Sequence, residues 1–226
     1  CSLEEMSNVS IELVRRSNLN DGIIYLCTTR GVPPSAEIRD PAKFTSRLYG
    51  WAQAIPQIAS PNHSGLTLII SSVPRIPESS VDATAKNFHW GDLIQARLEA
   101  GDRGAQNAIL LGHDGYVAEG AGFNVFAVND GIIRTPDHDC LKGITRRSVL
   151  EIAAHLGIDA REANITAKEL VAADEVFISS SAGGIFAVSS IDDLTIGSGA
   201  TGPITELIRN KYWEWRKSAE HTTEVH

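Results

Sequence analysis

The chain has 226 residues, of which 42% are hydrophobic and 21% are charged, as in an ordinary globular protein. Its 20 basic and 28 acidic residues give a formal net charge of −8, and because the basic residues are scattered we expect no nucleic-acid partner. The longest apolar stretches are far too short to cross a bilayer and the first residues do not resemble a signal peptide, so we expect a cytoplasmic protein without a membrane partner.

The three cysteines predict neither a disulfide framework nor a metal site. Cys1, Cys27 and Cys140 are odd in number and far apart, and no CxxC pair or nearby histidine at ligand spacing accompanies them. We therefore expect reduced thiols and no bound metal.

The first part of the chain predicts one helix followed by strands. Met6, Val9 and Leu13 share one face of a helix near the N-terminus. A β-type run from Ile23 to Cys27 follows, and the polar, proline-containing stretch from Arg30 to Lys43 predicts a long loop.

The next segments predict two strands and then a domain boundary. We expect strands at Trp51 to Ile58 and at Leu66 to Ser71, followed by a breaker-rich segment from Val73 to Asp82. The expected organisation is a small N-terminal α/β domain over 1–75, a linker over 76–85 and a large domain over 86–226.

The segment from Asn87 to Ala100 has a helical rhythm of apolar residues and ends at Gly101. Lys86 is thus predicted just before the helix or at its start. From Ala108 to Thr135 short β runs follow one another, and the NDG turn at 129–131 predicts a hairpin, so we expect an antiparallel meander.

The last part of the chain mixes helices and strands. An amphipathic helix is predicted from Thr145 to Leu156, and Thr166 with Glu169 fits a capping box for a short second helix. The remaining expected elements are strands at 175–179 and 185–188 and a helix from Pro203 through Trp213. Because no regular βαβ alternation is present, the fold class is predicted as α+β.

Common catalytic motifs such as HExxH, GxSxG, a Walker loop or GxGxxG after a strand are missing from the sequence. Three turns rich in Gly, Ser and Thr remain, at 119–124, 142–147 and 179–184. In the second turn, the N–H groups of Ile144 and Thr145 at a helix start would attract phosphate. The alternative is that Thr145 is only an N-cap.

In the third turn, Ser180 and Ser181 supply hydroxyl groups and Gly183 and Gly184 permit a ligand to approach the backbone. Alone, such a sequence is more often an ordinary turn. Lys86 is equally ambiguous on its own, because a lysine is usually a solvated surface charge.

Several separate strings together resemble the class IV aminotransferases, which include branched-chain and D-amino-acid aminotransferases, (R)-selective amine transaminases and aminodeoxychorismate lyase. The similarity runs from Ile76 to the last helix. It is carried by KNFHWGDL at 86–93, EGAGFN at 119–124, KGITRR at 142–147, ADEVFISSSAGGI at 173–185 and GPITELI at 202–208.

The resemblance implies a two-domain fold type IV enzyme that uses pyridoxal 5'-phosphate. It places the Schiff-base lysine at Lys86 and the carboxylate that pairs with the pyridine nitrogen at Glu119, with Asn124 in a supporting role. The phosphate-binding residues that it implies are Ile144, Thr145, Ser180 and Ser181.

The resemblance also implies an aminotransferase that acts on a small amine or amino acid and a keto acid, as a homodimer. KNFHWGDL, EGAGFN and SAGG look most like the (R)-selective amine transaminases, since branched-chain enzymes commonly carry Tyr in place of Gly91. The family's N-terminal stretch is incomplete here, so we expect a partial small domain. The alternatives are a lyase of the same family and a catalytically silent fragment of the fold.

Overall fold

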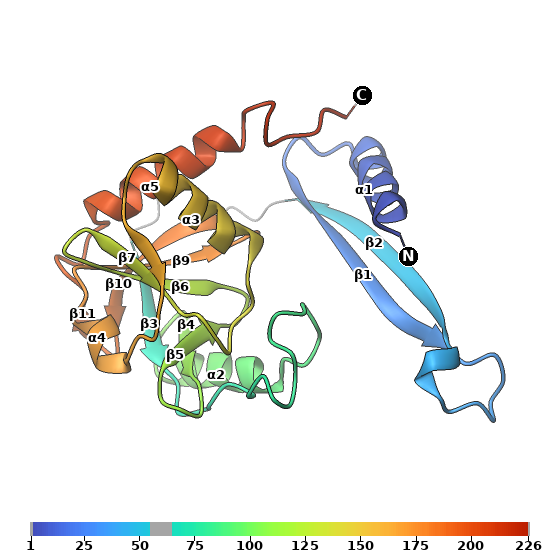
Figure 1. Cartoon of the computed structure of the whole chain (residues 1–226), viewed down its shortest axis with the longest axis horizontal. Coiled ribbons are helices and arrows are strands. Elements are labelled where there is room, and N and C mark those ends of the chain that lie inside the picture. Colours follow the sequence, from blue (N-terminus) through green and yellow to red (C-terminus); the bar gives the residue numbers. More distant parts are fainter. Residues whose placement is uncertain (1, 55–64, 226) are drawn as a thin grey trace. The chain divides into compact units, whose positions relative to one another are not determined.

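The computed structural model describes residues 2–54 and 65–225 and divides the chain into two compact units (Figure 1). The first unit is Cys1–Ala59 with Thr222–His226, and the second is Ser60–His221. The predicted linker 76–85 thus lies inside the second unit. The reason is that strand β3 (Leu66–Ile70) pairs in parallel with both β4 and β10 of the large sheet, which ties the chain to that sheet before residue 76.

The first unit consists of a helix and a hairpin. Helix α1 (Leu3–Ser17) begins where the Ser2 Oγ accepts a hydrogen bond from the Glu5 N–H (3.0 Å) and ends at Asn18 in the left-handed conformation. Leu13 of the helix packs on Gly50, where a β-carbon would lie 2.8 Å from the leucine Cδ1. The predicted N-terminal helix is confirmed.

Strands β1 (Gly22–Val32) and β2 (Thr45–Ala54) pair antiparallel and are joined by a loop with the short 3-10 helix η1 (Pro41–Lys43). The predicted loop therefore begins too early, because pairing with β2 keeps the chain extended as far as Val32. The predicted strand 51–58 is present as far as Ala54, and its remainder lies outside the described residues.

The second unit contains a nine-stranded sheet with the order β5-β4-β3-β10-β9-β6-β7-β8, with β11 paired to β10. Besides β3, its strands are β4 (Asn107–Leu111), β5 (Val117–Gly120), β6 (Asn124–Asn129), β7 (Ile132–Thr135), β8 (Ala160–Glu162), β9 (Glu175–Ser180), β10 (Gly184–Ile191) and β11 (Leu194–Thr195). The helices are α2 (Gly91–Asp102), α3 (Ile144–His155), α4 (Ala167–Val171) and α5 (Pro203–Trp215). The α+β prediction is confirmed.

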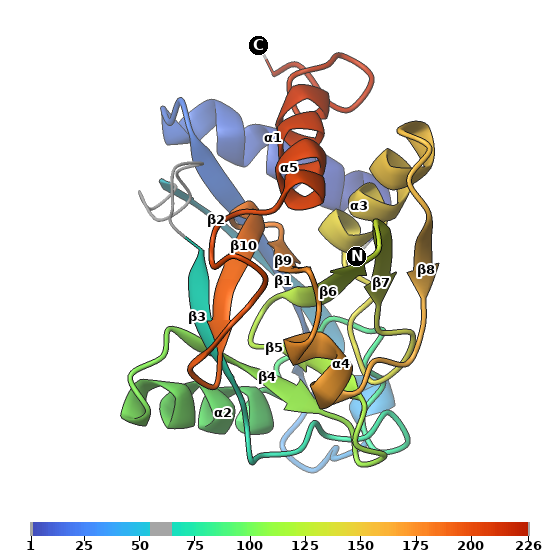
Figure 2. The same ribbon diagram turned by 90° about the vertical axis from the view of Figure 1, so that its left-hand side faces the viewer.

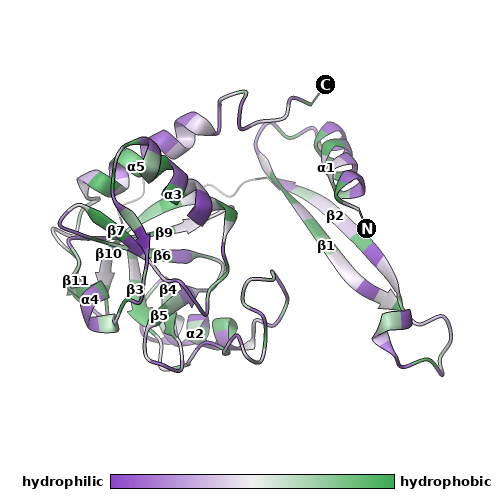
Figure 3. Cartoon of the chain, in the orientation of Figure 1, coloured by the Kyte–Doolittle hydropathy of each residue, from purple (hydrophilic) through white to green (hydrophobic). Residues whose placement is uncertain are grey.

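Successive residues of a strand point to opposite faces of the sheet and so belong to two different hydrophobic clusters. In β6, Val125 and Ala127 belong to one cluster, while Phe126 and Val128 belong to another that includes residues of α3 and α5. Leu93 and Ala96 of α2 cover the face of β3 and β4 in a third cluster. Figure 2 shows α2 beside β3 and β4, away from α3 and α5, and Figure 3 shows that α3 and α5 have both apolar and polar faces.

The predicted antiparallel meander over 108–135 is only partly correct. The β6–β7 hairpin is present, with Asp130 and Gly131 both at positive φ as its NDG turn requires. However, β6 lies between β7 and β9 and pairs with both, and the chain between β5 and β6 forms the isolated bridge Gly120 to Phe123. The chain therefore crosses between two parts of the sheet at the 119–124 turn.

Helices α3, α4 and α5 match the predictions closely. The capping box of α4 is present, since the Thr166 side chain and the Glu169 side chain each bond the other residue's backbone N–H. Helix α5 begins at Pro203 as predicted, but its cap comes from the buried Glu175 in β9. The Glu175 carboxylate accepts hydrogen bonds from the N–H groups of Ile204 (3.0 Å) and Thr205 (2.7 Å).

Within the residues that the structure describes, no helix has the length and apolar character needed to span a bilayer.

Candidate functional site

Glu119 is a buried carboxylate at the crossing between β5 and β6. The residue is 6% exposed, its Oε1 accepts a hydrogen bond from the Arg75 Nε (3.1 Å), and its Oε2 accepts one from the Leu141 N–H (3.0 Å). Burial raises the pKa of Glu119, against the lowering effects of the Leu141 N–H and of Arg75. Burial of a carboxylate beside only two donors is costly, which marks this position as a functional candidate.

Asn124 binds the carbonyl group of Leu141, the residue whose N–H donates to Glu119. It begins β6, and its Nδ2 donates a hydrogen bond to the Leu141 carbonyl (2.7 Å). Its Oδ1 lies so close to Gly143 that a β-carbon there would approach it to 2.4 Å. Leu141 is therefore held through both its N–H and its carbonyl, and a β-carbon at position 143 would require the Asn124 side chain to move.

The N-terminus of α3 starts directly after this glycine. Gly143 is the N-cap, and among the described residues no side chain caps the helix. Thr145 is buried in the first turn, so the alternative interpretation of Thr145 as the N-cap is wrong, because the chain enters the helix two residues earlier. The first N–H groups, including those of Ile144 and Thr145, have no intrahelical acceptor and form an opening suited to an anion.

The serine turn approaches the same place from β9. In the β6–β9 ladder Asn124 stands opposite Ser179, so Ser180 and Ser181 follow directly beyond the start of β6. The Ser179 Oγ is buried and has no hydrogen-bond partner in the described part of the chain. Asn124 thus stands between the two predicted anion turns, one on each side.

Lys86 lies in an irregular segment ahead of α2, and its side chain is exposed. The helix was predicted from residue 87 but begins at Gly91, because Asn87 forms a local turn. Its Nδ2 donates to the Ala85 carbonyl (2.8 Å), and its Oδ1 accepts from the His89 N–H (2.9 Å). Lys86 is therefore five residues before the helix rather than at its head.

Two contacts connect this segment with the Glu119 turn. A β-carbon at Gly122 would lie 3.5 Å from the Trp90 Cη2. Asp92 in the first turn of α2 forms a buried ion pair with Arg75 (Oδ2 to Nη1, 2.6 Å), and Arg75 in turn contacts Glu119. The structure thus joins Glu119, Asn124 and both anion turns directly, and reaches the segment of Lys86 through Trp90 and Asp92.

Sequence reasoning missed Arg75 and Asp92. Arg75 is flanked by Pro74 and Ile76 in the breaker-rich segment expected at the domain boundary, and a single arginine there gives no motif. Asp92 was the one sequence signal that pointed to this ion pair, because it lies within KNFHWGDL, at the start of a helix, where it is buried.

The loop at 136–142, which contains Leu141, is also held by Arg146. The buried Arg146 donates to the Pro136 carbonyl (2.7 Å) and pairs with Glu162 (2.9 Å), whose pKa is lowered to about 2, chiefly by this hydrogen bond with Arg146. Burial raises the pKa of Cys140 to about 11, so its thiol stays protonated and is unsuited to act as a nucleophile.

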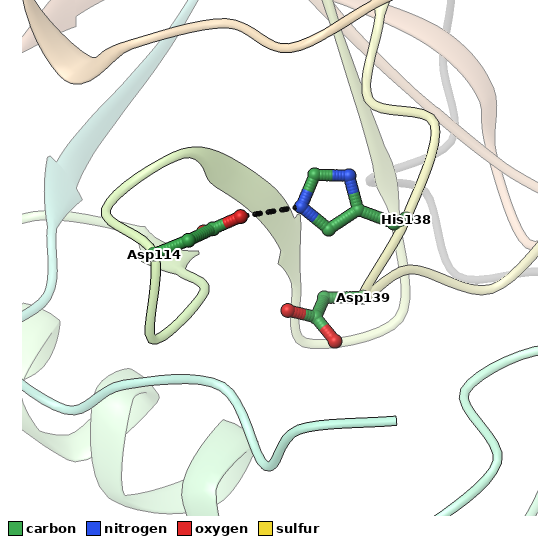
Figure 4. Close-up of side chains that lie close together, drawn as sticks. All are labelled: Asp114, His138 and Asp139. Carbon is green, nitrogen blue, oxygen red and sulfur yellow. Dashed lines mark hydrogen bonds and ion pairs between the residues drawn. The ribbon is translucent and has the colours of Figure 1, made fainter. Parts of the chain in front are cut away.

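His138 connects this loop with the β4–β5 turn (Figure 4). Its Nε2 lies 2.7 Å from the Asp114 Oδ2, the contact drawn in Figure 4. Its Nδ1 lies 2.5 Å from the Asp137 Oδ1. Among the described residues, Asp114, His138 and Asp139 form a group whose ligand-type atoms lie within 4.8 Å of one another. Because both ring nitrogens already contact carboxylates, we interpret the group as an ionic contact between two turns.

A scan against protein-family models matches residues 1–191 to the amino-transferase class IV family. The branched-chain-amino-acid aminotransferase of Escherichia coli K12 is 32% identical over 225 residues, which cover 94% of this chain and 70% of that protein. The enzyme of the same name from Pseudomonas aeruginosa is 41% identical over 136 residues, or 60% of this chain and 44% of that protein.

Solved structures show the same similarity. A T.th. branched-chain amino acid aminotransferase with pyridoxamine 5'-phosphate is 31% identical, has a TM-score of 0.92, and is matched over 100% of this chain and 77% of its own. The same protein complexed with N-(5'-phosphopyridoxyl)-L-glutamate has a TM-score of 0.89. The expectation of a special likeness to amine transaminases is not supported, because these relatives are branched-chain enzymes.

We expect the His138 contact to stabilise the fold within a limited pH window. Its pKa is raised, chiefly by the hydrogen bond with Asp137, so its contribution is complete below about pH 6.5 and is lost as the pH rises through the raised value. The pKa of Asp114 is lowered, so the contribution also falls at acid pH, below about 3.8.

Replacement of His138 by Gln should therefore lower the thermal midpoint by roughly 1–3 °C near pH 6 and by less near pH 9.5, as for a partly exposed ion pair. His113→Gln, an exposed neighbour, is the control and should have no such pH dependence. An equal loss at both pH values for His138→Gln would show that the charge of His138 is irrelevant.

Proposed function

The chain belongs to the class IV aminotransferase family, and we propose that it binds pyridoxal 5'-phosphate and transfers an amino group between an amino acid or amine and a keto acid. The observation that carries the proposal is the buried Glu119 carboxylate, joined through Leu141 to an uncapped helix N-terminus. The Glu119 carboxylate favours a cation, such as the protonated ring of the cofactor. The helix N-terminus favours an anion, such as the phosphate of the cofactor.

The described residues fit the cofactor at both ends. Glu119 is buried, and its two donors leave lone-pair positions on the carboxylate that a protonated pyridine nitrogen would use. At the other end, the open N-terminus of α3 and the Thr145 hydroxyl offer donors to a phosphate. When bound, pyridoxal phosphate supplies a conjugated ring that withdraws electrons from the substrate carbon.

Lys86 would hold the cofactor covalently through its side-chain amine. Its exposed side chain, on a segment that is not helical, satisfies the need for access that such an attack imposes. Once the substrate amine has displaced it, the Lys86 Nζ would accept a proton from the substrate carbon and donate it to the cofactor carbon. Glu119 would keep the ring nitrogen protonated throughout.

Ile144 and Thr145 would bind the phosphate through their backbone N–H groups, joined by the hydroxyls of Ser180 and Ser181 from the neighbouring turn. Asn124 would not react. It would hold Leu141 and Gly143 in place, so that the anion site keeps a fixed position relative to Glu119.

The amino donor that we propose is a branched-chain or similar aliphatic amino acid. The support is indirect and comes from the relatives, which are named branched-chain aminotransferases and one of which was solved in complex with 4-methylvaleric acid. The proposed reaction differs from that of a lyase of the same family, because it needs a keto acid as the acceptor.

Borohydride reduction followed by mass spectrometry should place a phosphopyridoxyl group on Lys86. Lys86→Ala should lose the adduct and lose amino transfer by about 10²–10⁴-fold or more, because it removes the proton carrier. Lys168→Ala, an exposed lysine of α4, is the control and should behave as the wild type. Transfer from leucine but not from an (R)-amine to a keto acid would support the proposed substrate, and an adduct on another lysine would contradict the role of Lys86.

Glu119→Gln should reduce turnover by roughly 10²–10³-fold while the cofactor still binds, because the neutral amide cannot stabilise a positive charge on the ring nitrogen. Turnover is measured by keto-acid formation and binding by the absorbance of the retained cofactor. Glu214→Gln on the exposed side of α5 is the matched control. Unchanged turnover in Glu119→Gln would remove Glu119 from the proposed site.

We also propose that the chain is a homodimer. In α1, β1 and β2 no described residue is buried, and Tyr25 and Trp51, whose rings stack, are 37% and 47% exposed. An exposed apolar hairpin is stabilised when another surface packs against it, and a second copy of the chain would supply that surface. Light scattering should give about twice the 24.3 kDa chain mass, whereas a monomer mass at micromolar concentration would contradict the proposal.

A further inference from the structure

Arg75 occupies the centre of a buried ionic chain that neither the family motifs nor the proposed roles require. It is 5% exposed, and its guanidinium contacts Asp92 through Nη1 (2.6 Å) and Glu119 through Nε (3.1 Å). Its backbone N–H also donates to the Leu111 carbonyl (2.8 Å), so the residue is fixed against β4. The Arg75 guanidinium thus donates to two carboxylates through two different nitrogens.

Asp92 acts on Arg75 from the start of α2. Its Oδ2 accepts hydrogen bonds from both the Arg75 Nη1 and the Ile76 N–H (2.8 Å), which fixes the carboxylate against the backbone as well as the side chain of this segment. Its place in the first turn of the helix suits a negative charge. Its Oδ1 is buried without a partner among the described residues, so its stability in the site depends on the pair with Arg75.

The Glu119 carboxylate still has lone-pair positions free for a further donor. Arg75 uses one lone-pair position of Oε1 and the Leu141 N–H uses one of Oε2, while an ionised carboxylate offers about four positions. Both of these donors also restrain the orientation of the carboxylate plane. The third neighbouring titratable group, Cys140, is neutral and does not compete for this role.

Charge explains why Arg75 is needed. Burial favours the protonated form of Glu119, and the nearby negative charge of Asp92 acts in the same direction, whereas Arg75 and the Leu141 N–H favour the ionised form. A protonated Glu119 would no longer stabilise a positive charge on the cofactor ring. The only side-chain cation in direct contact with Glu119 among the described residues is Arg75.

We propose that Arg75 is a positioning residue that keeps Glu119 ionised and correctly oriented toward the cofactor ring nitrogen, and that Asp92 holds Arg75 in place for this purpose. The proposal rests on the proposed function, because it assumes that Glu119 contacts that nitrogen. It assigns to Asp92, the last polar residue of KNFHWGDL, a role in the cofactor half of the site.

The test uses pyridoxal phosphate labelled with ¹⁵N in its ring, bound to the full chain, and compares wild type, Arg75→Gln, Asp92→Asn and Asp92→Ala. The ring-nitrogen NMR signal reports the proton on that atom, and circular dichroism reports folding. Arg134→Gln is the matched control, since Arg134 pairs with Glu169 at the surface of the same unit.

Arg75→Gln should still form the borohydride adduct on Lys86, but the ring-nitrogen signal near pH 7.5 should move toward the unprotonated form. Loss of a neighbouring charge changes a pKa by about 1–3 units, so kcat should fall by roughly 10–1,000-fold with a smaller change in KM. Asp92→Asn keeps the arginine charge and an acceptor for it, and its signal should stay close to that of the wild type. Asp92→Ala removes the acceptor that holds the Arg75 Nη1, so its signal should move in the same direction as that of Arg75→Gln, and a wild-type signal in folded Asp92→Ala would contradict the role of Asp92.

An unchanged nitrogen signal in folded Arg75→Gln would overturn the proposal, and so would an equal effect of Asp92→Asn, which would indicate packing rather than charge. If Arg75→Gln does not fold, Arg75→Lys decides. This variant keeps the charge and loses the fork, so a protonated nitrogen with reduced kcat supports the proposal and wild-type kinetics contradict it. Failure of the wild type to form any adduct on Lys86 would instead refute the proposed function.

Discussion

The contact between the Glu119 carboxylate, the Arg75 guanidinium and the Leu141 amide is the constraint on which the candidate site depends. A buried carboxylate is costly, and here two donors from different parts of the chain offset that cost. The same contacts fix the end of β5, the 71–76 segment and the 136–142 loop relative to one another. Any change that moves Glu119 would therefore also move the start of α3, which follows Leu141 by three residues.

The sheet places the two anion turns next to this carboxylate. Because β6 is almost wholly buried and lies between β7 and β9, its register with β9 is fixed, and this pairing sets Asn124 opposite Ser179. Strand register thus decides that the Ser180 turn and the start of α3 meet at Asn124. The uncapped helix is tolerable only where a ligand or water satisfies its first N–H groups, so its position beside the serine turn has a functional explanation.

Local patterns in the sequence predict most elements of the second unit, since hairpin turns, capping boxes and amphipathic helices depend on residues close in the chain. The failures have long-range or side-chain causes. The helix after Lys86 starts late because the Asn87 side chain bonds its neighbours, and the meander is interrupted because β6 pairs with β9, which comes much later in the chain. Glu119 and Asn124 could be found from their motif, but Arg75 could not, because its partners are Asp92 and Glu119, 17 and 44 residues away.

The same contacts explain why the motifs identify the family better than the substrate. Asp92 in KNFHWGDL holds Arg75, Asn124 in EGAGFN holds Leu141, and Gly183 lets the serine turn approach the Phe186 ring, which would lie 2.4 Å from a β-carbon there. Each of these residues supports the carboxylate or a turn of the proposed cofactor site. We expect enzymes that use different amino donors to share such residues, because they bind the same cofactor. Resemblance in these strings therefore supports the cofactor chemistry and carries no information about the amino donor.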